Sequence, residues 1–590
     1  MYYSGGNYEA FSSPGAGNVN ESGKVYIIGS GIAALSAACF LIRDGGVRGE
    51  NIHILERNPI PGGALDGYSF DNIGFVLRSD RSVDEHSECL WDLFRSIPAA
   101  GGDESVLDEF CTLNRNDPNY SLCRVTKNRG EEEKLEGKYG LSDSALRQVI
   151  KVFFAADTEL YGKKISDVFD SEVTGSNFWL YLRTLLGFEN WHGAIEMKRC
   201  LRRFIHHVEG LPDFKDLKFT KYNQYESMIL PLMEYLEPRG VVFEYGVRVQ
   251  NVIFDCGTSK KIANRIDIIR DGEEDSIDLT RRDLVFITNG SVAENTGIGS
   301  QDECASYNTE IREGGSFDLW RNIAGQNSAF GHPDVFCTAP EHTSRVSATI
   351  TTLDRTIIPY IKKISKRDPF SGRTVTGGIV TVRDSSWLLN WSVGRQPRFR
   401  GQDKDQVVIS LYGLYTDRPG DYVGKTMRDA SGMEICEEWL YHIGVPEEQI
   451  REIAANHARC VPVVMPYVTA VYMPRSEGDR PKVVPDGAVN FAFIGQFAET
   501  KDDSVLTMEY SVRTAMEAVY TLLDLDRAVP AVWNGSSDIR MVSEALVRLS
   551  DGKTLREMKL GFFERMLVKR VLKKLKRTEL MLMLEKLHVV

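Results

Sequence analysis

The sequence predicts an α/β fold in which a Rossmann-like domain, assembled from separate stretches of the chain, is combined with a mixed α+β domain and a C-terminal helical segment. Three observations predict this fold. An apolar, β-branched run at 24–28 enters a glycine turn and a small-residue helix. A second short strand at 51–56 ends in an acidic residue, and strands that run into glycine turns recur at 283–290 and 489–499. Strands that alternate with helices in this way are typical of parallel sheets.

The glycine turn near the N-terminus has the spacing of a dinucleotide-binding motif, Gly29-x-Gly31-x-x-Ala34. Gly29 permits the tight turn, Gly31 lets backbone N–H groups approach a pyrophosphate, and Ala34 lets the helix pack closely on the strand. The positive end of the helix would then face the phosphates. A strand–helix turn that merely contains glycines is the alternative interpretation.

Two further features favour a cofactor site and indicate FAD rather than NAD. Glu56 ends the second strand, at the place where an acidic side chain accepts hydrogen bonds from a ribose. The stretch Pro61-Gly62-Gly63-Ala64 then supplies another small-residue loop on the phosphate side, a continuation more typical of FAD sites. We therefore expect this part of the chain to be an FAD-binding domain.

Two later strands are expected to return to the same domain. The first ends at Gly290, and the second carries Gly495, Gln496 and Phe497 before a helix at 506–523. The N-terminus of that helix suits the electron-rich edge of a flavin, although another core crossover is the alternative. The expected divisions are an N-terminal arm at 1–23, a discontinuous FAD-binding domain at 24–140, 225–340 and 481–530, a substrate domain at 141–224 and 341–480, and a C-terminal segment at 531–590.

Composition narrows the class of protein. With 590 residues, 42% hydrophobic and 26% charged, the chain is expected to hold two or three globular domains. A net charge of −12 disfavours nucleic acid as a partner. The ten cysteines lack metal-ligand spacing and no secretory signal precedes them, so we expect no metal site, no disulfides and a cytoplasmic location. No apolar run reaches the roughly 18 residues of a membrane span, so any membrane contact should be peripheral.

Residue patterns predict two helices. An apolar stripe predicts a helix over 84–97, for which simple packing is the alternative to a role in a site. Between Arg565 and Arg577, seven of 13 residues are Lys or Arg and none is acidic, while apolar residues recur at steps of three or four. This pattern predicts a basic amphipathic helix that lies on an anionic membrane, or alternatively one that packs against a domain or a second subunit.

The chain as a whole resembles the oleate hydratase family, also called the myosin-cross-reactive antigens. The resemblance is carried by the stretches 1–8, 37–44, 51–56, 88–98, 218–228, 366–372, 377–384 and 493–500. It implies an FAD-binding enzyme, usually a homodimer, that adds water across an isolated cis double bond of a long-chain unsaturated fatty acid. The reaction has no net redox change, and the flavin is most active when reduced (FADH2). Arg81, which matches the family motif, is expected in the cofactor site.

The resemblance also implies where the chemistry takes place. An unactivated alkene needs an acid to protonate one carbon and a base to draw a proton from the incoming water. The family uses a Glu in an Arg-Gly-Gly-Arg-Glu-Met-Glu-x-His motif and a Tyr after a Met-Arg-Arg-like run. Here Ser82 and Cys200 occupy these two positions, while Gln224 matches a family glutamine. Glu85 would share a face with Ser82 if the segment were helical, so it, Asp80 or Asp84 could take over the base role.

The carboxylate end differs as well. Where the family holds the fatty-acid carboxylate with Thr, Asn and His, this chain has Ser392, Gly394 and Arg398. Ser392 keeps a hydroxyl and Arg398 could pair with an anion, whereas Gly394 has lost the amide. We therefore expect weak hydration of oleate itself and a reaction at the double bond of another long-chain or polyene acid by hydration, dehydration or isomerisation. A redox flavoenzyme (oxidase or desaturase) and a non-catalytic lipid-binding flavoprotein are the alternatives.

Overall fold

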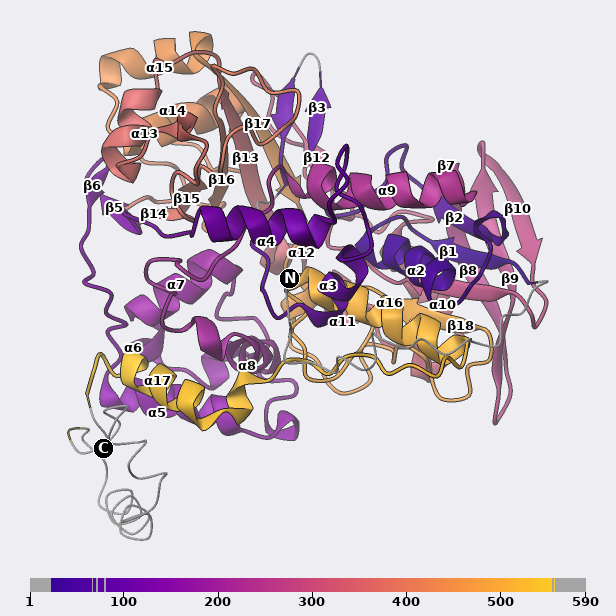
Figure 1. The fold of residues 1–590 in the computed structure, drawn as a ribbon. Helices are drawn as coiled ribbons and strands as arrows, with labels where there is room; N and C mark the ends of the chain where they lie inside the picture. Colours follow the sequence, from indigo (N-terminus) through magenta and orange to yellow (C-terminus); the bar gives the residue numbers. More distant parts are fainter. Residues whose placement is uncertain (1–22, 66, 71–72, 79–80, 554–556, 558–590) are drawn as a thin grey trace.

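A computed structural model of the chain describes residues 23–65, 67–70, 73–78, 81–553 and 557 (Figure 1). The expected N-terminal arm, Asp80 and the basic helix of 565–577 therefore lie outside the described residues, apart from residue 23 of the arm. In the described part of the chain, no helix combines the length and the apolar character needed to cross a bilayer.

A five-stranded parallel sheet confirms the predicted α/β fold. Its strands lie in the order β18 (Phe491–Ile494), β11 (Leu284–Thr288), β1 (Val25–Ile28), β2 (Ile52–Glu56) and β7 (Val242–Tyr245). Of the two late strands, β11 pairs with β1 and β18 pairs with β11, so both return to this sheet as their apolar runs and glycine ends predicted. Such runs suit the inner strands of a parallel sheet because helices cover both of its faces.

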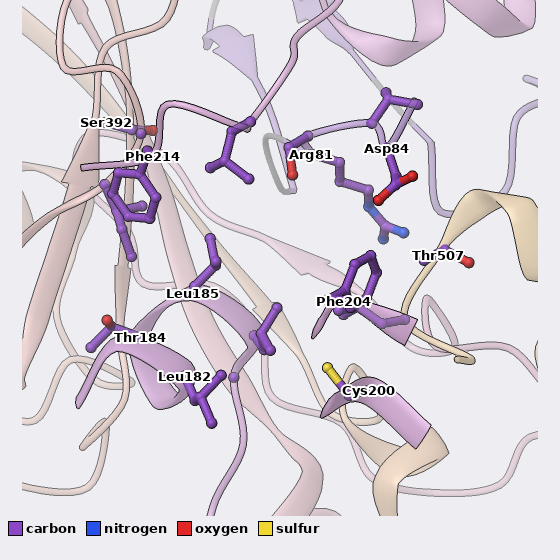
Figure 2. Close-up of a pocket in the computed structure, with 18 of the residues that line it drawn as sticks. Arg81, Asp84, Leu182, Thr184, Leu185, Cys200, Phe204, Phe214, Ser392 and Thr507 are labelled. Atoms are coloured by element: carbon purple, nitrogen blue, oxygen red, sulfur yellow. The ribbon is translucent and has the colours of Figure 1, made fainter. Parts of the chain in front are cut away.

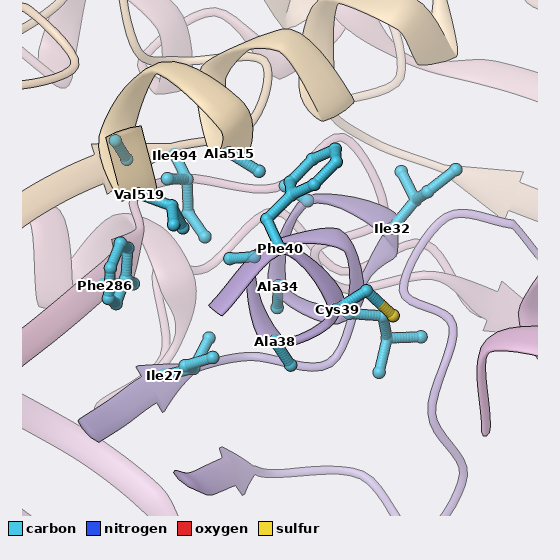
Figure 3. Packing of buried hydrophobic residues seen from close by; sticks show 14 of the residues in the cluster. Ile27, Ile32, Ala34, Ala38, Cys39, Phe40, Phe286, Ile494, Ala515 and Val519 are labelled. Carbon is cyan, nitrogen blue, oxygen red and sulfur yellow. The ribbon is translucent and has the colours of Figure 1, made fainter. Parts of the chain in front are cut away.

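Small side chains allow two helices to pack closely on this sheet. Helix α2 (Ile32–Arg43) follows β1, and α16 (Met508–Leu522) follows β18. Figure 3 shows Ala34 and Ala38 of α2 near Ile27, while Phe40 lies toward Ala515 of α16. Residues from a three-stranded antiparallel sheet, with the order β10 (Glu273–Asp278), β9 (Lys261–Arg270) and β8 (Arg248–Cys256), belong to the same hydrophobic core.

The second large sheet has eight strands. Its order is β12 (Gly297–Ile298), β17 (Ala458–Met465), β13 (Arg345–Thr352), β16 (Val408–Gly413), β15 (Leu389–Ser392), β14 (Val380–Val382), β5 (Val125–Lys127) and β6 (Glu131–Glu132). Its core also includes residues of α13 (Ile358–Ser365), α14 (Gly432–His442) and α15 (Glu447–Asn456). Three short strands, the edge strands β6 and β12 and the neighbouring β5, come from stretches that the sequence placed with the cofactor domain. Strands of two or three residues are too short for a hydrophobic pattern that shows which sheet they join. The domain limits therefore remain predictions.

Side chains from several helices form a further hydrophobic core. These helices are α5 (Asp143–Phe154), α6 (Ser171–Thr174), α7 (Asn177–Leu186), α8 (Ala194–Arg203), α10 (Ser316–Ala324), α11 (Asp334–Cys337) and α17 (Ile539–Leu549). The remaining regular elements are β3 (Tyr68–Phe70), β4 (Gly74–Val76), α3 (Glu88–Phe94), α4 (Val106–Asn116), α9 (Leu230–Leu236) and α12 (Pro340–Thr343).

The helix predicted over 84–97 is shorter than expected. It begins only at Glu88, as α3, because the preceding residues are held in other conformations. The backbone N–H of Val83 donates to the carbonyl of Lys218, and the Asp84 carboxylate accepts from the backbone N–H of His86. A side chain that bonds its own backbone two residues on competes with the helix. Residues 82–87 therefore form an extended and turned segment.

Candidate functional site

The glycine turn after β1 has the backbone geometry that its spacing predicted. Gly29 has a positive φ of 91°, and its N–H donates to Leu55 at 2.8 Å. The N–H of Gly62 donates to the carbonyl of Ser30, which brings the second glycine loop against the turn. A Cβ on Gly63 would lie 3.0 Å from the Cα of Gly31, whereas a Cβ on Gly31 would meet nothing closer than 3.8 Å. The protein therefore leaves open space beside Gly31, at the N-terminus of α2.

The carboxylate of Glu56 lies beside this turn and is 6% exposed. One of its oxygens accepts from the backbone N–H and the hydroxyl of Ser30, at 2.9 and 2.7 Å. The other accepts from the backbone N–H and the side-chain amide of Asn58, at 2.7 and 2.9 Å. A ribose hydroxyl would replace one of the two side-chain donors. The sequence reasoning missed Ser30 and Asn58, although both stand within two residues of predicted site positions.

The other predicted cofactor residues divide into two groups. Gly495 follows β18 at a φ of 96° and lies near Ala33 of α2, and Gln496 lines the cavity described below. By contrast, Ala34 is buried in α2, and Phe497 is 1% exposed among aromatic side chains. Gly290 makes room for that ring, because a Cβ there would lie 2.9 Å from it. The Phe497 side chain thus belongs to the core, and its carbonyl accepts from the side-chain amide of Asn289 at 3.1 Å.

A large cavity with a volume of about 380 Å³ lies between the helical core and the eight-stranded sheet (Figure 2). Apolar side chains of α7, α8 and the loop after α8 form part of its wall, among them Phe178, Leu182, Leu185, Leu201, Phe204, Leu211 and Phe214. Figure 2 shows Thr184, Phe214 and Ser392 on one side, with Arg81, Asp84 and Thr507 on the other. A mostly apolar, concave site with a few polar groups is the usual form of a small-molecule site.

The structure brings Ser82, Cys200 and Arg81 together in this wall. Burial, with the nearby charge of Glu196 as a smaller cause, raises the pKa of Cys200 to about 12. The thiol is thus protonated at neutral pH and is a weaker acid than an ordinary phenol with a pKa of about 10. Tyr472, which the sequence reasoning missed, also lines the cavity and donates to the carbonyl of Leu186 at 3.2 Å.

Glu85 and Gln224 are not part of the cavity wall. The side chain of Glu85 is 45% exposed and forms an ion pair with Lys218. The expectation that Glu85 shares a face with Ser82 required a helix, and this segment is not helical. Gln224 is buried, and its side-chain amide donates to the carbonyl of Arg81 at 2.9 Å. It thus holds the backbone of a wall residue.

Asp84 is the acidic neighbour of Ser82 that does reach the cavity. Its Oδ2 lies 3.0 Å from Nε2 of His206 and 2.8 Å from Nε2 of His207, which also lines the wall. Burial would raise the pKa of Asp84, but hydrogen bonds with the two imidazoles hold it well below its usual value. Burial likewise opposes the charge on His207, yet hydrogen bonds with Asp216 and Asp84 raise its pKa to about 9. Nothing in the sequence pattern pointed to the two histidines.

The predicted carboxylate-binding residues are only partly together. Ser392 and Gly394 line the cavity, whereas Arg398 does not. Arg398 is 2% exposed, and its carbonyl accepts from the backbone and side-chain N–H groups of Asn223, at 2.9 and 3.0 Å. The backbone N–H of Arg398 donates to the side-chain oxygen of Gln402 at 2.8 Å. Besides Arg78 and Arg81, the cavity is lined by Arg345, the first residue of β13, which the sequence reasoning missed.

The protein thus combines an α/β fold with a glycine turn of the dinucleotide-binding type and a mostly apolar cavity. The chain belongs to the MCRA family, whose model matches residues 22–520. It is 44% identical over 564 residues to oleate hydratase of Streptococcus pyogenes serotype M49 (strain NZ131), with 95% of each chain covered. It is also 26% identical over 531 residues to linoleate hydratase of Lactiplantibacillus plantarum, with 84% of this chain and 93% of the relative covered.

Solved structures with a similar arrangement include cyclohexylamine oxidase from Brevibacterium oxydans IH-35A. That match has a TM-score of 0.49 at 11% identity and covers 85% of this chain and 98% of the oxidase. A putrescine oxidase variant matches with a TM-score of 0.48 at 10% identity, and covers 85% of this chain and 98% of that one.

Proposed function

We propose that this protein is an FAD-binding, fatty-acid hydratase-like enzyme, a hydro-lyase that acts on a carbon–carbon double bond of a long-chain unsaturated or polyene acid. The observation that carries the proposal is the apolar cavity, which places Ser82, Asp84 and Cys200 in one wall. The 44% identity to an oleate hydratase over nearly the whole chain supports the same reaction class. Hydration, dehydration and double-bond isomerisation all remain within this proposal.

The residues around the glycine turn fit FAD. The open space beside Gly31 suits a pyrophosphate, and the N–H groups of the first turn of α2 would point at it. We propose that Glu56 would hold a ribose and that Arg81, Gly495 and Gln496 would contact the flavin. When bound, FAD, active in its reduced form, would supply a structural and electrostatic element beside the double bond.

The acid and base work then falls to residues of the cavity wall. We propose that Asp84, oriented by His206 and His207, accepts a proton from water as the C–O bond forms, and that the Cys200 thiol donates a proton to the other alkene carbon. The carboxyl and thiolate that result exchange protons with solvent, so that one water is added overall. In isomerisation, the proton gained at one carbon is matched by another lost from a neighbouring carbon.

The pKa shifts favour a double bond that is easier to protonate than that of oleate. A carboxylate with a depressed pKa is a weak base, and a thiol whose pKa is about 12 is a weak acid. A conjugated polyene acid accepts a proton more readily, because its cation is delocalised. We therefore propose polyene or otherwise activated acids as the preferred substrates.

Turnover in H₂¹⁸O tests the proposal. The FAD-loaded protein, with dithionite as reductant, is incubated with a panel of monounsaturated, polyunsaturated and conjugated acids, and the products are analysed by mass spectrometry. We expect an ¹⁸O-labelled hydroxy acid or a shifted double bond, strongest with conjugated acids and lost in Asp84→Asn. Bleaching of oxidised flavin by a substrate without added reductant would favour a redox enzyme instead. Acid binding without any product would favour a lipid-binding protein.

Two further properties belong to the proposal. We propose a cytoplasmic homodimer that associates peripherally with anionic membranes, where a water-insoluble substrate is concentrated. The basic pattern of 565–577 supports the membrane contact. Light scattering coupled to size-exclusion chromatography checks the dimer, because a mass near 66.4 kDa would show a monomer.

A further inference from the structure

The end of the cavity remote from Asp84 is rich in buried arginine. Arg345 is 9% exposed and lines the cavity, and Arg124, which is 8% exposed, lies directly behind the wall. Two wall residues contact Arg124: the hydroxyl of Thr184 accepts from its Nη2 at 2.9 Å, and the ring of Phe214 lies 4.4 Å from its guanidinium carbon. Figure 2 shows Thr184 and Phe214 on the side opposite Asp84 and Arg81.

These two cations have less compensating negative charge than buried arginines usually have. No described carboxylate forms an ion pair with Arg124, whose other side-chain acceptor is the hydroxyl of Thr381 at 2.9 Å. Glu189 lies 3.7 Å from Arg345, but its closer ion pair, at 2.6 Å, is with Arg183. Three guanidinium groups therefore share one described carboxylate at this end of the cavity. A buried charge without a partner is costly, so a site of this kind favours an anion.

Unused hydrogen-bond donors also indicate that this end of the cavity favours an anion. The Nε atoms of Arg124 and Arg345 are buried and have no hydrogen-bond partner among the described residues. Burial lowers the pKa of Arg124 to about 10, which still leaves the guanidinium protonated at neutral pH. Tyr412 lies in the wall near both arginines, and its hydroxyl donates to the carbonyl of Thr184. The polar groups at this end thus offer positive charge and donors to a ligand.

We propose that Arg345 and Arg124 form the anion-binding end of the cavity and bind the carboxylate of a long-chain acid. Arg345 would contact the carboxylate directly from the wall, and Arg124 would add its charge from behind Thr184 and Phe214. The hydrocarbon chain would then extend through the apolar middle of the cavity toward Asp84 and Cys200. This subsite supplies the charge that Arg398, which does not line the cavity, was expected to supply. The inference rests on the proposed function, because it assumes that the ligand is a fatty acid.

Comparison of a charged with an uncharged ligand tests this subsite. A fluorescent fatty acid is displaced from the full-length protein by linoleic acid, by its methyl ester and by the corresponding alcohol. We expect the wild type to bind the acid more tightly than the two neutral ligands. Arg345→Met should weaken acid binding by about thirtyfold or more and Arg124→Met by roughly tenfold, with ester binding changed less than about twofold.

Controls separate loss of charge from loss of fold. Arg129→Met removes a similar side chain that pairs with Glu447 away from the cavity, and it should leave acid binding unchanged. Arg124→Lys and Arg345→Lys keep the charge and should retain most of the preference for the acid. Thermal melting shows whether each variant is folded. Removal of an uncompensated charge should leave the melting temperature of Arg124→Met equal to or above that of the wild type.

The outcomes distinguish this inference from the proposed function. An acid preference in the wild type that persists in the folded Arg124→Met/Arg345→Met double variant would overturn the subsite and leave the function standing. Equal affinity of the wild type for the acid and the ester would also overturn the subsite and leave the proposed function standing. A wild type that binds none of the three ligands would overturn the proposed function, and the subsite with it.

Discussion

Asp84 and His207 lie 2.8 Å apart across the cavity wall, although 123 positions separate them in the chain. The carboxylate holds both this imidazole and that of His206, while Ser82 stands two residues away in the same extended segment. Asp84 is thus an acidic group of the cavity wall, beside Asp216 and Glu509, and two histidines hold its carboxylate. This wall, the glycine turn and the C-terminus lead to five predictions.

Replacement of Asp84 by Asn should abolish most activity and also reduce stability. The change leaves Arg203 and His207 without their shared anion, and loss of one partner of a buried ionic group costs about 3 kcal/mol. Turnover should fall by about a hundredfold or more. Product formation and urea unfolding measure the two effects.

Glu85→Gln is the matched control for Asp84→Asn. Its carboxylate is 45% exposed and pairs with Lys218 outside the wall, so unfolding free energy should change by less than about 1 kcal/mol and turnover should stay near the wild-type value. Equal loss of activity in the two variants would refute the assignment of Asp84.

The raised pKa of His207 predicts that stability falls as pH rises from 6.5 to about 9. In this range the folded protein keeps a proton that the unfolded chain has released, so the contribution is complete below pH 6.5 and is lost by about pH 9. For one proton the slope is at most about 1.4 kcal/mol per pH unit. Urea unfolding at several pH values measures this slope, which should be smaller in His207→Gln and unchanged in a variant of the exposed His332. Parallel curves for wild type and His207→Gln would contradict the prediction.

Gly31→Ala should prevent FAD retention while the protein stays folded. The added Cβ meets only the Cα of Gly63, at 3.8 Å, so the protein itself tolerates it, but it occupies the space beside the pyrophosphate. Gly401→Ala, where a Cβ meets nothing within 4 Å, is the control. Absorbance at flavin wavelengths and circular dichroism check the two outcomes. A Gly31→Ala protein as yellow as the control would place the cofactor elsewhere, and Gly31→Val should have a still larger effect.

The double variant Ser82→Glu/Cys200→Tyr should gain some hydration of oleate. Both positions line the cavity, so the new carboxylate and phenol would face the same space. We expect partial recovery only, because Gly394 still lacks the amide of the family motif and the two changes are coupled. Mass analysis for hydroxy acids, with each single variant beside the double, measures the gain. A folded, FAD-loaded double variant without hydroxy acid would mean that these positions do not determine the substrate.

Removal of the residues after Lys553 should release the protein from anionic vesicles without loss of FAD. This boundary keeps the Asp551 carboxylate, which accepts from the N–H groups of Tyr139 and Gly140 at 2.7 and 3.0 Å. Each basic residue near an anionic surface contributes on the order of 1 kcal/mol, and high salt should weaken binding of the full chain only in part. Vesicle co-sedimentation measures the difference. Equal sedimentation of both proteins would assign this segment to packing.

Local patterns predicted the parallel sheet well, because an apolar run followed by a glycine with positive φ is written in consecutive residues. Ser82 and Cys200 were reached through the family resemblance. The prediction that Glu85 shares a face with Ser82 assumed a helix. The polar stretch gave no sign that the Asp84 carboxylate would instead accept from the backbone N–H of His86 and interrupt the helix. The contacts of Asp84 with His206, and of Arg124 with Thr184, depend on how α7 and α8 fold back on the sheets. No spacing in the sequence encodes such contacts.

The sheet that carries the glycine turn has a consequence for synthesis of the protein. β1 pairs with β11, and β11 with β18, so the sheet joins residues near 25, 285 and 491. A ribosome must therefore translate more than four fifths of the chain before the last strand is available. Until then the open edge of β11 lacks its neighbour, and such an edge invites pairing with another nascent chain. Overexpression at low temperature, which slows translation and aggregation, should therefore raise the soluble yield.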